Sequence, residues 1–182
     1  MTDATPDWIF GYGSLIWRPD FEHDERRPAR LSGWLRRFYQ YSVDHRGVPD
    51  DPGRVVTLLE REAAHCWGAA FRVGAERVRQ ILTRLDERES KGYDRRHVDV
   101  ELVGDGGTER VRAAMYIATP ENAYWAGPAP VEQIARRIAR AEGPSGLNRE
   151  YLFQLAAFLD RIDVRDRHVD ELEHRVRRRI RG

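Results

Sequence analysis

Apolar and polar positions alternate along several segments of the first two thirds of the chain, and this alternation predicts strands. Over 67–73, the apolar residues Trp67, Ala69, Phe71 and Val73 fall on one face, as in a half-buried strand with a period of two. Related patterns predict further strands over 8–12, 55–59, 97–102 and 110–118. The glycine-rich segment 104–107 is predicted to be the hairpin turn between the last two strands.

Apolar residues spaced three and four positions apart predict helices elsewhere in the chain. Over 75–87, the residues Val78, Ile81, Leu82 and Leu85 follow this spacing. Two more apolar stripes occur in the last third, the first made of Val131, Ile134, Ala135 and Ile138, and the second of Tyr151, Leu152, Leu155, Phe158, Leu159 and Ile162. Asn148 is the predicted N-cap of the second of these helices. Strands followed by helices predict an α+β fold with a mainly antiparallel sheet or barrel.

Length and charge favour one domain that binds neither nucleic acid nor membranes. The chain has 182 residues, enough for a single domain over 1–182, in which 166–182 is a basic C-terminal helix or tail. The formal net charge is +1 although 34% of residues are charged, a balance unlike that of a protein that coats nucleic acid or anionic lipid. The concentrated basic residues are Arg175, Arg177, Arg178, Arg179 and Arg181. A solvated terminal helix explains this run better than a nucleic-acid contact, since no aromatic residues interleave the arginines.

The cysteine content and the N-terminus predict a cytoplasmic protein. Cys66 is the one cysteine of the chain, so it forms no internal disulfide, which fits a reducing compartment. Residues 1–7 carry neither the basic nor the apolar part of a signal peptide. Apolar runs everywhere fall short of membrane-spanning length.

The segment 10–17, FGYGSLIW, is the most informative motif for function. Two glycines flank Tyr12 where a buried strand is expected to end, and Ser14 follows directly. Glycine permits positive φ and a close approach of backbone and ligand. Such a turn leaves converging N–H groups free, which suits a carboxylate or a developing oxyanion.

Other chemistries match this sequence poorly. The third glycine of a dinucleotide fingerprint would fall at Ile16, and Lys91 lies in no phosphate-binding loop. Ser14 is in no nucleophile elbow, and a hydrolase that uses His45 with its neighbour Asp44 would need two side chains that point apart on an extended segment. A metal site at His168, Glu171 and His174 is explained more simply as an exposed charged helix.

Two further segments are candidate parts of a site. The carboxylate-dense run 86–93 contains Asp86, Glu87 and Glu89 ahead of a glycine and Tyr93, and from the residues alone any of the three carboxylates can be the general base. The segment 143–152, GPSGLNREYL, is explained as a rigid turn with an asparagine cap, which leaves Tyr151 as either a core or a site residue.

Taken together, these motifs resemble the ChaC family of γ-glutamylcyclotransferases, in its glutathione-specific branch. The resemblance extends from about residue 8 to about residue 160, with the helix from Asp166 onward outside it. The motifs that carry it, in order, are 10–17 (FGYGSLIW), 33–38 (GWLRRF), 42–47 (SVDHRG), 52–55 (PGRV), 88–93, 122–128 and 143–152.

The resemblance implies a γ-glutamylcyclotransferase-like fold, which is a small mixed or mainly antiparallel barrel-like sheet with flanking helices. It implies a lyase that uses no cofactor and no metal and cleaves glutathione to 5-oxoproline and cysteinylglycine. The family's catalytic glutamate matches Glu89, and its substrate loop matches Tyr12, Gly13, Ser14 and Leu15, while Tyr151 is expected to border the pocket.

The resemblance leaves several points open. Other γ-glutamyl amides or dipeptides are alternative substrates, and a regulator of cation transport is the alternative without enzymatic activity. Arg36, Arg37 and Arg46 are candidates to bind the glycyl carboxylate of glutathione. No obligatory protein partner is expected, and the oligomeric state is not predicted.

Overall fold

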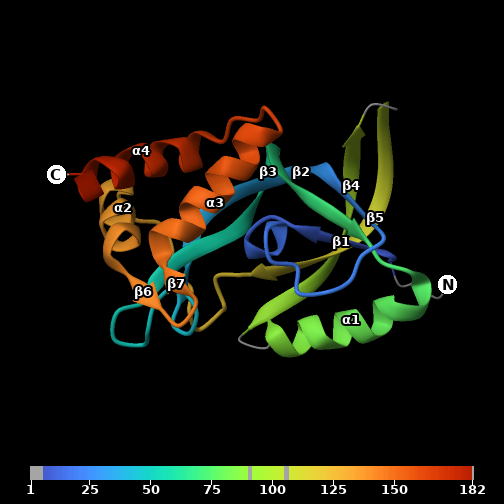
Figure 1. Cartoon of the computed structure of the whole chain (residues 1–182), viewed down its shortest axis with the longest axis horizontal. Coiled ribbons are helices and arrows are strands. Elements are labelled where there is room, and N and C mark those ends of the chain that lie inside the picture. The colour runs from blue at the N-terminus through green and yellow to red at the C-terminus, as the bar shows by residue number, and fades with distance from the viewer. Residues whose placement is uncertain (1–5, 90–91, 105–106, 182) are drawn as a thin grey trace. The chain divides into compact units, whose positions relative to one another are not determined.

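A computed structural model describes residues 6–89, 92–104 and 107–181. The chain forms two compact units, the first from Met1–Leu35 and Leu58–Asn122 and the second from Arg36–Thr57 and Ala123–Gly182. The prediction that they make up a single domain stays a prediction. The elements, labelled as in Figure 1, are β1 (Trp8–Gly11), the 3₁₀ helix η1 (Ser14–Ile16), β2 (Glu25–Ser42), β3 (Gly53–Arg72), α1 (Ala75–Arg88), β4 (Tyr93–Gly104), β5 (Gly107–Ala118), α2 (Val131–Arg140), β6 (Glu142–Gly143), β7 (Gly146–Leu147), α3 (Asn148–Arg161) and α4 (Arg167–Arg181).

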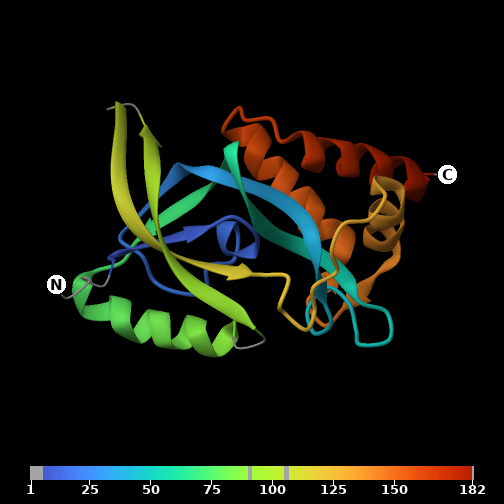
Figure 2. The ribbon, with the colours of Figure 1, turned by 180° about the vertical axis from the view of Figure 1, so that it is seen from behind.

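Five strands close into a barrel in the order β1-β3-β2-β4-β5. Most neighbouring strands run antiparallel, and the closing pair of β1 with β5 is parallel, with Trp8 opposite Ala113. The predicted α+β fold with a mixed, mainly antiparallel barrel is therefore confirmed. β4 and β5 form the predicted hairpin, seen from behind in Figure 2, in which Gly104 pairs with Gly107. Residues 105 and 106 of the predicted turn lie outside the described residues.

β3 is one continuous strand where the sequence predicted two short ones. Its two ends, which include the predicted 55–59 and most of 67–73, are largely buried, whereas the side chains of 60–63 are exposed. Backbone pairing can continue where no side chain enters a core, so the middle of the strand carries no alternation that predicts it.

β2 was not predicted, because its buried positions change phase and include polar residues. Before Gly33 the buried residues are Ala29 and Leu31, at odd positions, and after it they fall at even positions from Arg36 to Ser42. Gly33 itself has φ +83°, a value that side chains disfavour. Because Arg36 and Ser42 are polar but buried, the hydrophobicity of this segment does not alternate with a period of two.

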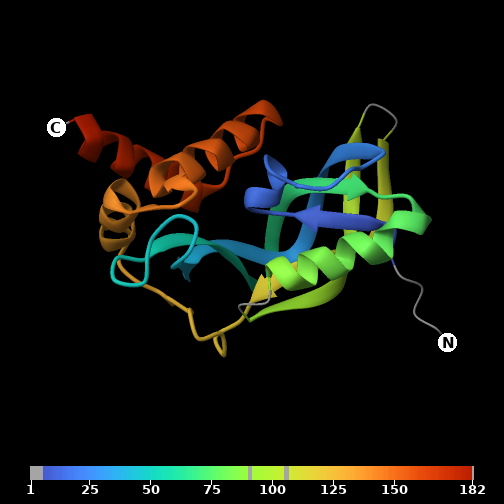
Figure 3. The ribbon, with the colours of Figure 1, turned by 60° about the horizontal axis from the view of Figure 1, so that its bottom comes forward.

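Helix α1 covers one side of the barrel within the first unit (Figure 3). The predicted apolar stripe is buried, and its residues pack on Ile9 of β1 and Ala114 of β5. Leu15 and Tyr116 belong to this same core cluster. The helix therefore ends, at Arg88, beside the segment that follows β1.

In the second unit, α4 is not simply a solvated tail. Its residues Val169, Leu172 and Val176 are buried, and the helix packs on α2 and α3. Arginines of the predicted basic run form ion pairs within the protein. Arg175 and Arg179 both contact Glu132 of α2.

The predicted N-cap role of Asn148 is wrong. Asn148 is the first residue of α3 and makes no side-chain cap hydrogen bond. Its side chain instead accepts from the Arg54 N–H at 2.8 Å and donates to the Arg54 carbonyl at 2.8 Å. An asparagine amide carries both a donor and an acceptor, so it can satisfy both backbone groups of one residue in a neighbouring strand.

Candidate active site

The turn after β1 is built as a short 3₁₀ helix. The Ile16 N–H donates to the Gly13 carbonyl at 2.9 Å, and the Trp17 N–H donates to the Ser14 carbonyl at 3.2 Å. The N–H groups of Ser14 and Leu15 precede the first donor of this described turn, so they have no acceptor inside it. The predicted binding of a ligand by these N–H groups stays a prediction.

Gly11 is required in this turn for a different reason from the positive φ that was expected. Neither Gly11 nor Gly13 has a positive φ, and Gly13 has φ −134°. A Cβ on Gly11 would lie 2.7 Å from the Cβ of Leu15. Gly11 is therefore needed because the turn folds back closely on the end of the strand.

The side chains of Tyr12 and Leu15 face the protein interior. Tyr12 is 6% exposed, and its hydroxyl donates to the Tyr116 carbonyl at 2.8 Å. Leu15 is 8% exposed and packs in the core beneath α1. The predicted contact of Tyr12 and Leu15 with substrate stays a prediction.

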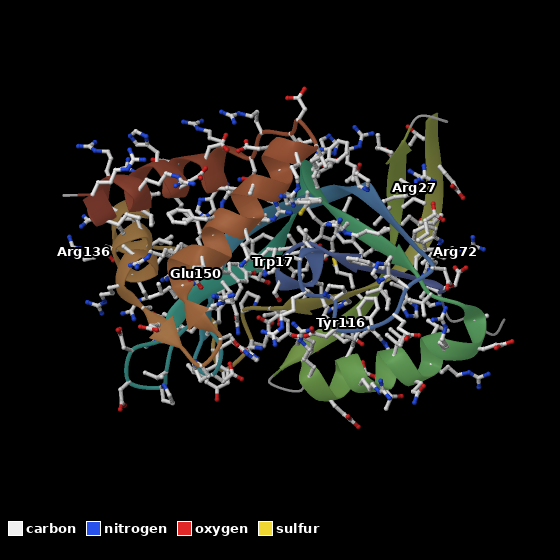
Figure 4. The ribbon with its side chains drawn as sticks, viewed as in Figure 1. Trp17, Arg27, Arg72, Tyr116, Arg136 and Glu150 are labelled. Carbon is white, nitrogen blue, oxygen red and sulfur yellow. The ribbon has the colours of Figure 1, made fainter. Side chains whose placement is uncertain are left out.

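Asp86, one of the three candidate bases, is held in a structural network. Its Oδ1 lies 2.7 Å from the Tyr116 hydroxyl, and its Oδ2 accepts from Arg95 at 2.9 Å. Figure 4 shows Tyr116 beside α1. Burial raises the pKa of the Tyr116 hydroxyl, and the hydrogen bond to Asp86 raises it further, so the phenol stays protonated and bound to this carboxylate.

Glu89 caps the C-terminus of α1 and is the more enclosed candidate. Its N–H donates to the Leu85 carbonyl at 2.8 Å, and its side chain is 19% exposed. The carbonyl of Glu89 accepts from the Tyr93 N–H at 3.2 Å, where β4 begins. Glu87, by contrast, is exposed.

Arg88 connects Glu89 with the turn after β1. Its Nε lies 3.4 Å from Oε1 of Glu89, and its Nη2 donates to the Ser14 hydroxyl at 3.4 Å. Its Nη1 donates to Oδ2 of Asp20 at 3.2 Å. Two motifs 75 residues apart, one with Ser14 and one with Glu89, therefore meet through one guanidinium. Sequence reasoning gave no role to Arg88 or Asp20, although Arg88 lies within the motif that carries Glu89.

Tyr151, also predicted as a site residue, belongs to the second unit. It is 5% exposed, its hydroxyl accepts from the Val56 N–H at 3.4 Å, and its ring meets Phe38 edge-on. Its predicted contact with substrate stays a prediction. Two of the candidate arginines of this unit are buried. The side chain of Arg36 is fully buried and paired with Asp166, and Arg46 is 8% exposed. Neither is therefore a surface charge.

The residues weighed for a serine hydrolase have other partners. Nδ1 of His45 lies 3.0 Å from the hydroxyl of Ser145, on the turn between β6 and β7. The hydroxyl of Ser14 accepts from Arg88. His45 and Ser14 are therefore each engaged with a different group.

His168, weighed as a metal ligand, has a structural contact. Its Nε2 accepts from the Phe38 N–H at 3.3 Å, and burial lowers the pKa of its imidazole to about 4, with a smaller contribution from Arg37. Within 6–89, 92–104 and 107–181, no three His, Cys, Asp or Glu side chains gather as a group that can hold a metal ion. Among the helices of these described ranges, none is long and apolar enough to cross a membrane.

The closed mixed barrel with flanking helices is the γ-glutamylcyclotransferase-like fold that the sequence predicted. The candidate site adds a carboxylate at the end of α1 and the turn after β1. The model of the ChaC-like protein family matches residues 7–179, so the chain belongs to this family. The match includes most of α4, so the family resemblance does not stop near residue 160 as expected from the sequence.

Named relatives and a solved structure agree with this assignment. The chain is 46% identical over 154 residues to the human glutathione-specific γ-glutamylcyclotransferase 1, covering 84% of this chain and 69% of the relative. It is 43% identical over 178 residues to γ-glutamylcyclotransferase 2-3 of Arabidopsis thaliana, covering 93% and 88%. A crystal structure of the yeast γ-glutamylcyclotransferase specific to glutathione superposes with a TM-score of 0.88 at 28% identity, covering 96% of each chain.

Proposed function

We propose that this protein is a glutathione-specific γ-glutamylcyclotransferase that releases 5-oxoproline and cysteinylglycine without a cofactor. The observation that carries the proposal is the shared contact of Ser14 and Glu89 with Arg88, which places a largely enclosed carboxylate close to the turn after β1. The names of its relatives supply the substrate.

The reaction is an intramolecular aminolysis. The α-amino nitrogen of the γ-glutamyl group bonds to its own γ-carbonyl carbon, and the bond from that carbon to the cysteinyl nitrogen breaks. The attacking nitrogen loses protons and the departing nitrogen gains them, so the products balance without a co-reactant. Because the reacting groups are already tethered, the enzyme has to fix the folded conformer and move protons.

Glu89 is the proposed general acid and base. At neutral pH the α-amine is an ammonium, so it needs a base before it can attack. Glu89 takes this proton and returns one to the departing nitrogen. The N–H groups of Ser14 and Leu15 are proposed to bind the α-carboxylate or the tetrahedral oxyanion, because both carry negative charge that N–H donors stabilise.

The test of this function is the release of 5-oxoproline and cysteinylglycine from glutathione by the purified protein. Glu89→Gln keeps the shape of the side chain and removes the base, so turnover should fall at least ~10²-fold with an unchanged unfolding midpoint. Glu87→Gln, an exposed neighbour, is the matched control and should turn over glutathione as the wild type does. Near-normal release of 5-oxoproline by Glu89→Gln would contradict the assignment of Glu89 as the base.

The same assay with γ-glutamyl dipeptides in place of glutathione tests the specificity. Equal kcat/KM values for glutathione and for γ-glutamylalanine would replace the proposed substrate with γ-glutamyl compounds in general. A wild-type protein inert towards all of them would refute the enzymatic function.

A further inference from the structure

All three nitrogen atoms of the Arg88 guanidinium contact a different acceptor. Nε contacts the Glu89 carboxylate, Nη1 the Asp20 carboxylate and Nη2 the Ser14 hydroxyl, at 3.4, 3.2 and 3.4 Å. The side chains of Arg88 and Glu89 are 25% and 19% exposed, whereas that of Asp20 is 52% exposed, so Asp20 is the solvent-facing member of this arrangement. A guanidinium is planar and its donors are fixed relative to one another, so contacts on three sides define where each acceptor lies.

Asp20 is the outer support of this arrangement. It has φ +57°, a left-handed conformation that is uncommon outside glycine and better tolerated by aspartate and asparagine than by most residues. Its carboxylate contacts Nε of Arg18 at 3.4 Å as well as Arg88. Non-glycine residues in this region of φ are often held at functional sites by their surroundings.

We propose that Arg88 is a positioning residue which, supported by Asp20, holds the Glu89 carboxylate at a fixed place relative to the Ser14 turn. This inference rests on the proposed function. It assigns to Arg88 the alignment of the proposed base, Glu89, with the turn proposed to bind the oxyanion. Proton transfer requires the base within hydrogen-bond reach of the reacting nitrogen, and a displacement of about 1 Å can cost on the order of 10²-fold in rate. The role of Arg88 is thus to fix geometry, since each of its nitrogen atoms already holds a group of the protein.

A purely structural role of Arg88 makes a different prediction. Arg88 is the last residue of α1, where a cation stabilises the helix through its dipole. If that were its whole contribution, removing the charge would lower the unfolding midpoint and leave the kcat of the folded enzyme unchanged.

The experiment measures kcat, KM and the urea unfolding midpoint of Arg88→Gln, Arg88→Lys and Asp20→Asn with glutathione. Arg77→Gln is the matched control, because Arg77 lies on the same helix and pairs with Glu22 and Asp24 of the segment before β2. The wild type and Glu89→Gln are run in the same assay, so that failure of the proposed function is seen separately.

We expect Arg88→Gln to lose on the order of 10²-fold in kcat with KM within about threefold of wild type. Lysine keeps the charge but not the planar fork, so Arg88→Lys should remain at least about tenfold below wild type. Asp20→Asn should fall between Arg88→Gln and wild type, and it should add little when combined with Arg88→Gln, because both act on one network. Arg77→Gln should keep wild-type kcat.

Wild-type kcat in Arg88→Gln, or full activity in Arg88→Lys, would overturn the inference while the function stands. A raised KM at unchanged kcat would also overturn it, because Arg88 would then bind substrate and not align Glu89. If Arg88→Gln fails to fold, the kcat of Asp20→Asn is the test. A wild-type kcat in Asp20→Asn would then contradict the proposed support of Arg88 by Asp20. If the wild type releases no 5-oxoproline, the function and the inference fall together.

Discussion

At the scale of single residues, the environment of each carboxylate separates the candidates that the sequence left equal. Asp86 is bound to Tyr116 and Arg95, and Glu87 is exposed. Glu89 is enclosed and contacts Arg88, which also reaches the Ser14 turn. Burial and partners, which depend on residues distant in sequence, therefore distinguish the three carboxylates, and the role of Glu89 as the base stays part of the proposed function.

Gly92, directly before β4, adopts a backbone conformation that favours glycine. It has φ +86°, and its carbonyl accepts from the side-chain amide of Asn122 at 2.6 Å. A Cβ at this position would lie 2.7 Å from Nδ2 of Asn122. Both the backbone conformation and the space available therefore require glycine.

We predict that Gly92→Ala is more costly than a matched substitution at Gly33. Gly33 has nearly the same φ, +83°, but a Cβ there would meet nothing within 4 Å. Gly33→Ala should therefore cost about 1–2 kcal/mol from the left-handed backbone alone. Gly92→Ala should cost more than that and also lower glutathione turnover, because a shift at Gly92 reaches Tyr93, whose N–H donates to the Glu89 carbonyl. Urea unfolding and 5-oxoproline release measure the two effects, and equal losses at both positions would contradict this account.

At the scale of elements, α4 shows how a predicted tail becomes part of the second unit. Its buried face packs on α2 and α3, and Arg177 stacks on the ring of Phe153 of α3, with 4.2 Å from its guanidinium carbon to the ring centroid. His168, near the start of α4, accepts the Phe38 N–H of β2. This contact needs an imidazole nitrogen without a proton, so it depends on the neutral form.

The neutral His168 predicts a loss of stability in mild acid. Its pKa falls to about 4 in the folded protein from an ordinary 6.5, so between these values the unfolded chain binds a proton that the folded chain does not. The stabilisation present above pH 6.5 is therefore lost as the pH falls towards 4, by at most about 3 kcal/mol. Arg36, Arg37, Asp166 and Glu171 are the charged groups that face the imidazole.

Unfolding midpoints of wild type and His168→Gln between pH 8 and 4 measure this contribution. Glutamine keeps an acceptor and does not titrate, so the variant should lose less stability than the wild type over this range. If the unfolding midpoints of the two proteins fell in parallel with pH, His168 would not be the cause of the loss of stability in mild acid.

At the scale of the whole molecule, the charged residues largely balance one another. The formal net charge is +1, and arginines of the basic run contact carboxylates of α2 and α4, as in the pairs of Arg175 with Glu132 and of Arg177 with Glu173. The ion pairs with Arg179 and Arg175 hold the pKa of Glu132 below its ordinary value. The positive charge of this helix is thus partly neutralised within the protein.

We predict that the protein does not bind duplex DNA at physiological salt. Nucleic-acid affinity grows with the number of phosphates that free cations neutralise, and partly paired arginines compete poorly for them. Fluorescence anisotropy of a labelled duplex should stay flat up to micromolar protein. Salt-sensitive binding, weakened in a variant with Arg178 and Arg181 replaced by glutamine, would reverse this expectation.

The sequence by itself determined the elements whose apolar pattern is regular, together with the family. The period of two in 110–118 and the helical stripe of α1 report local burial, and both elements form where predicted. The ordered motifs indicated the ChaC-like family and, through it, Glu89 and the loop 12–15. From the residues alone, the choice among the carboxylates of 86–89 stayed open.

Only the tertiary structure decided which groups meet across long stretches of chain. It joined β3 into one strand, revealed β2 with its buried Arg36, and placed the Asn148 amide on the backbone of Arg54. It also brought Arg88 between Glu89, Ser14 and Asp20. The physical reason is that periodicity records which face of an element is buried, whereas the partner of a polar group is set by the packing of elements distant in sequence.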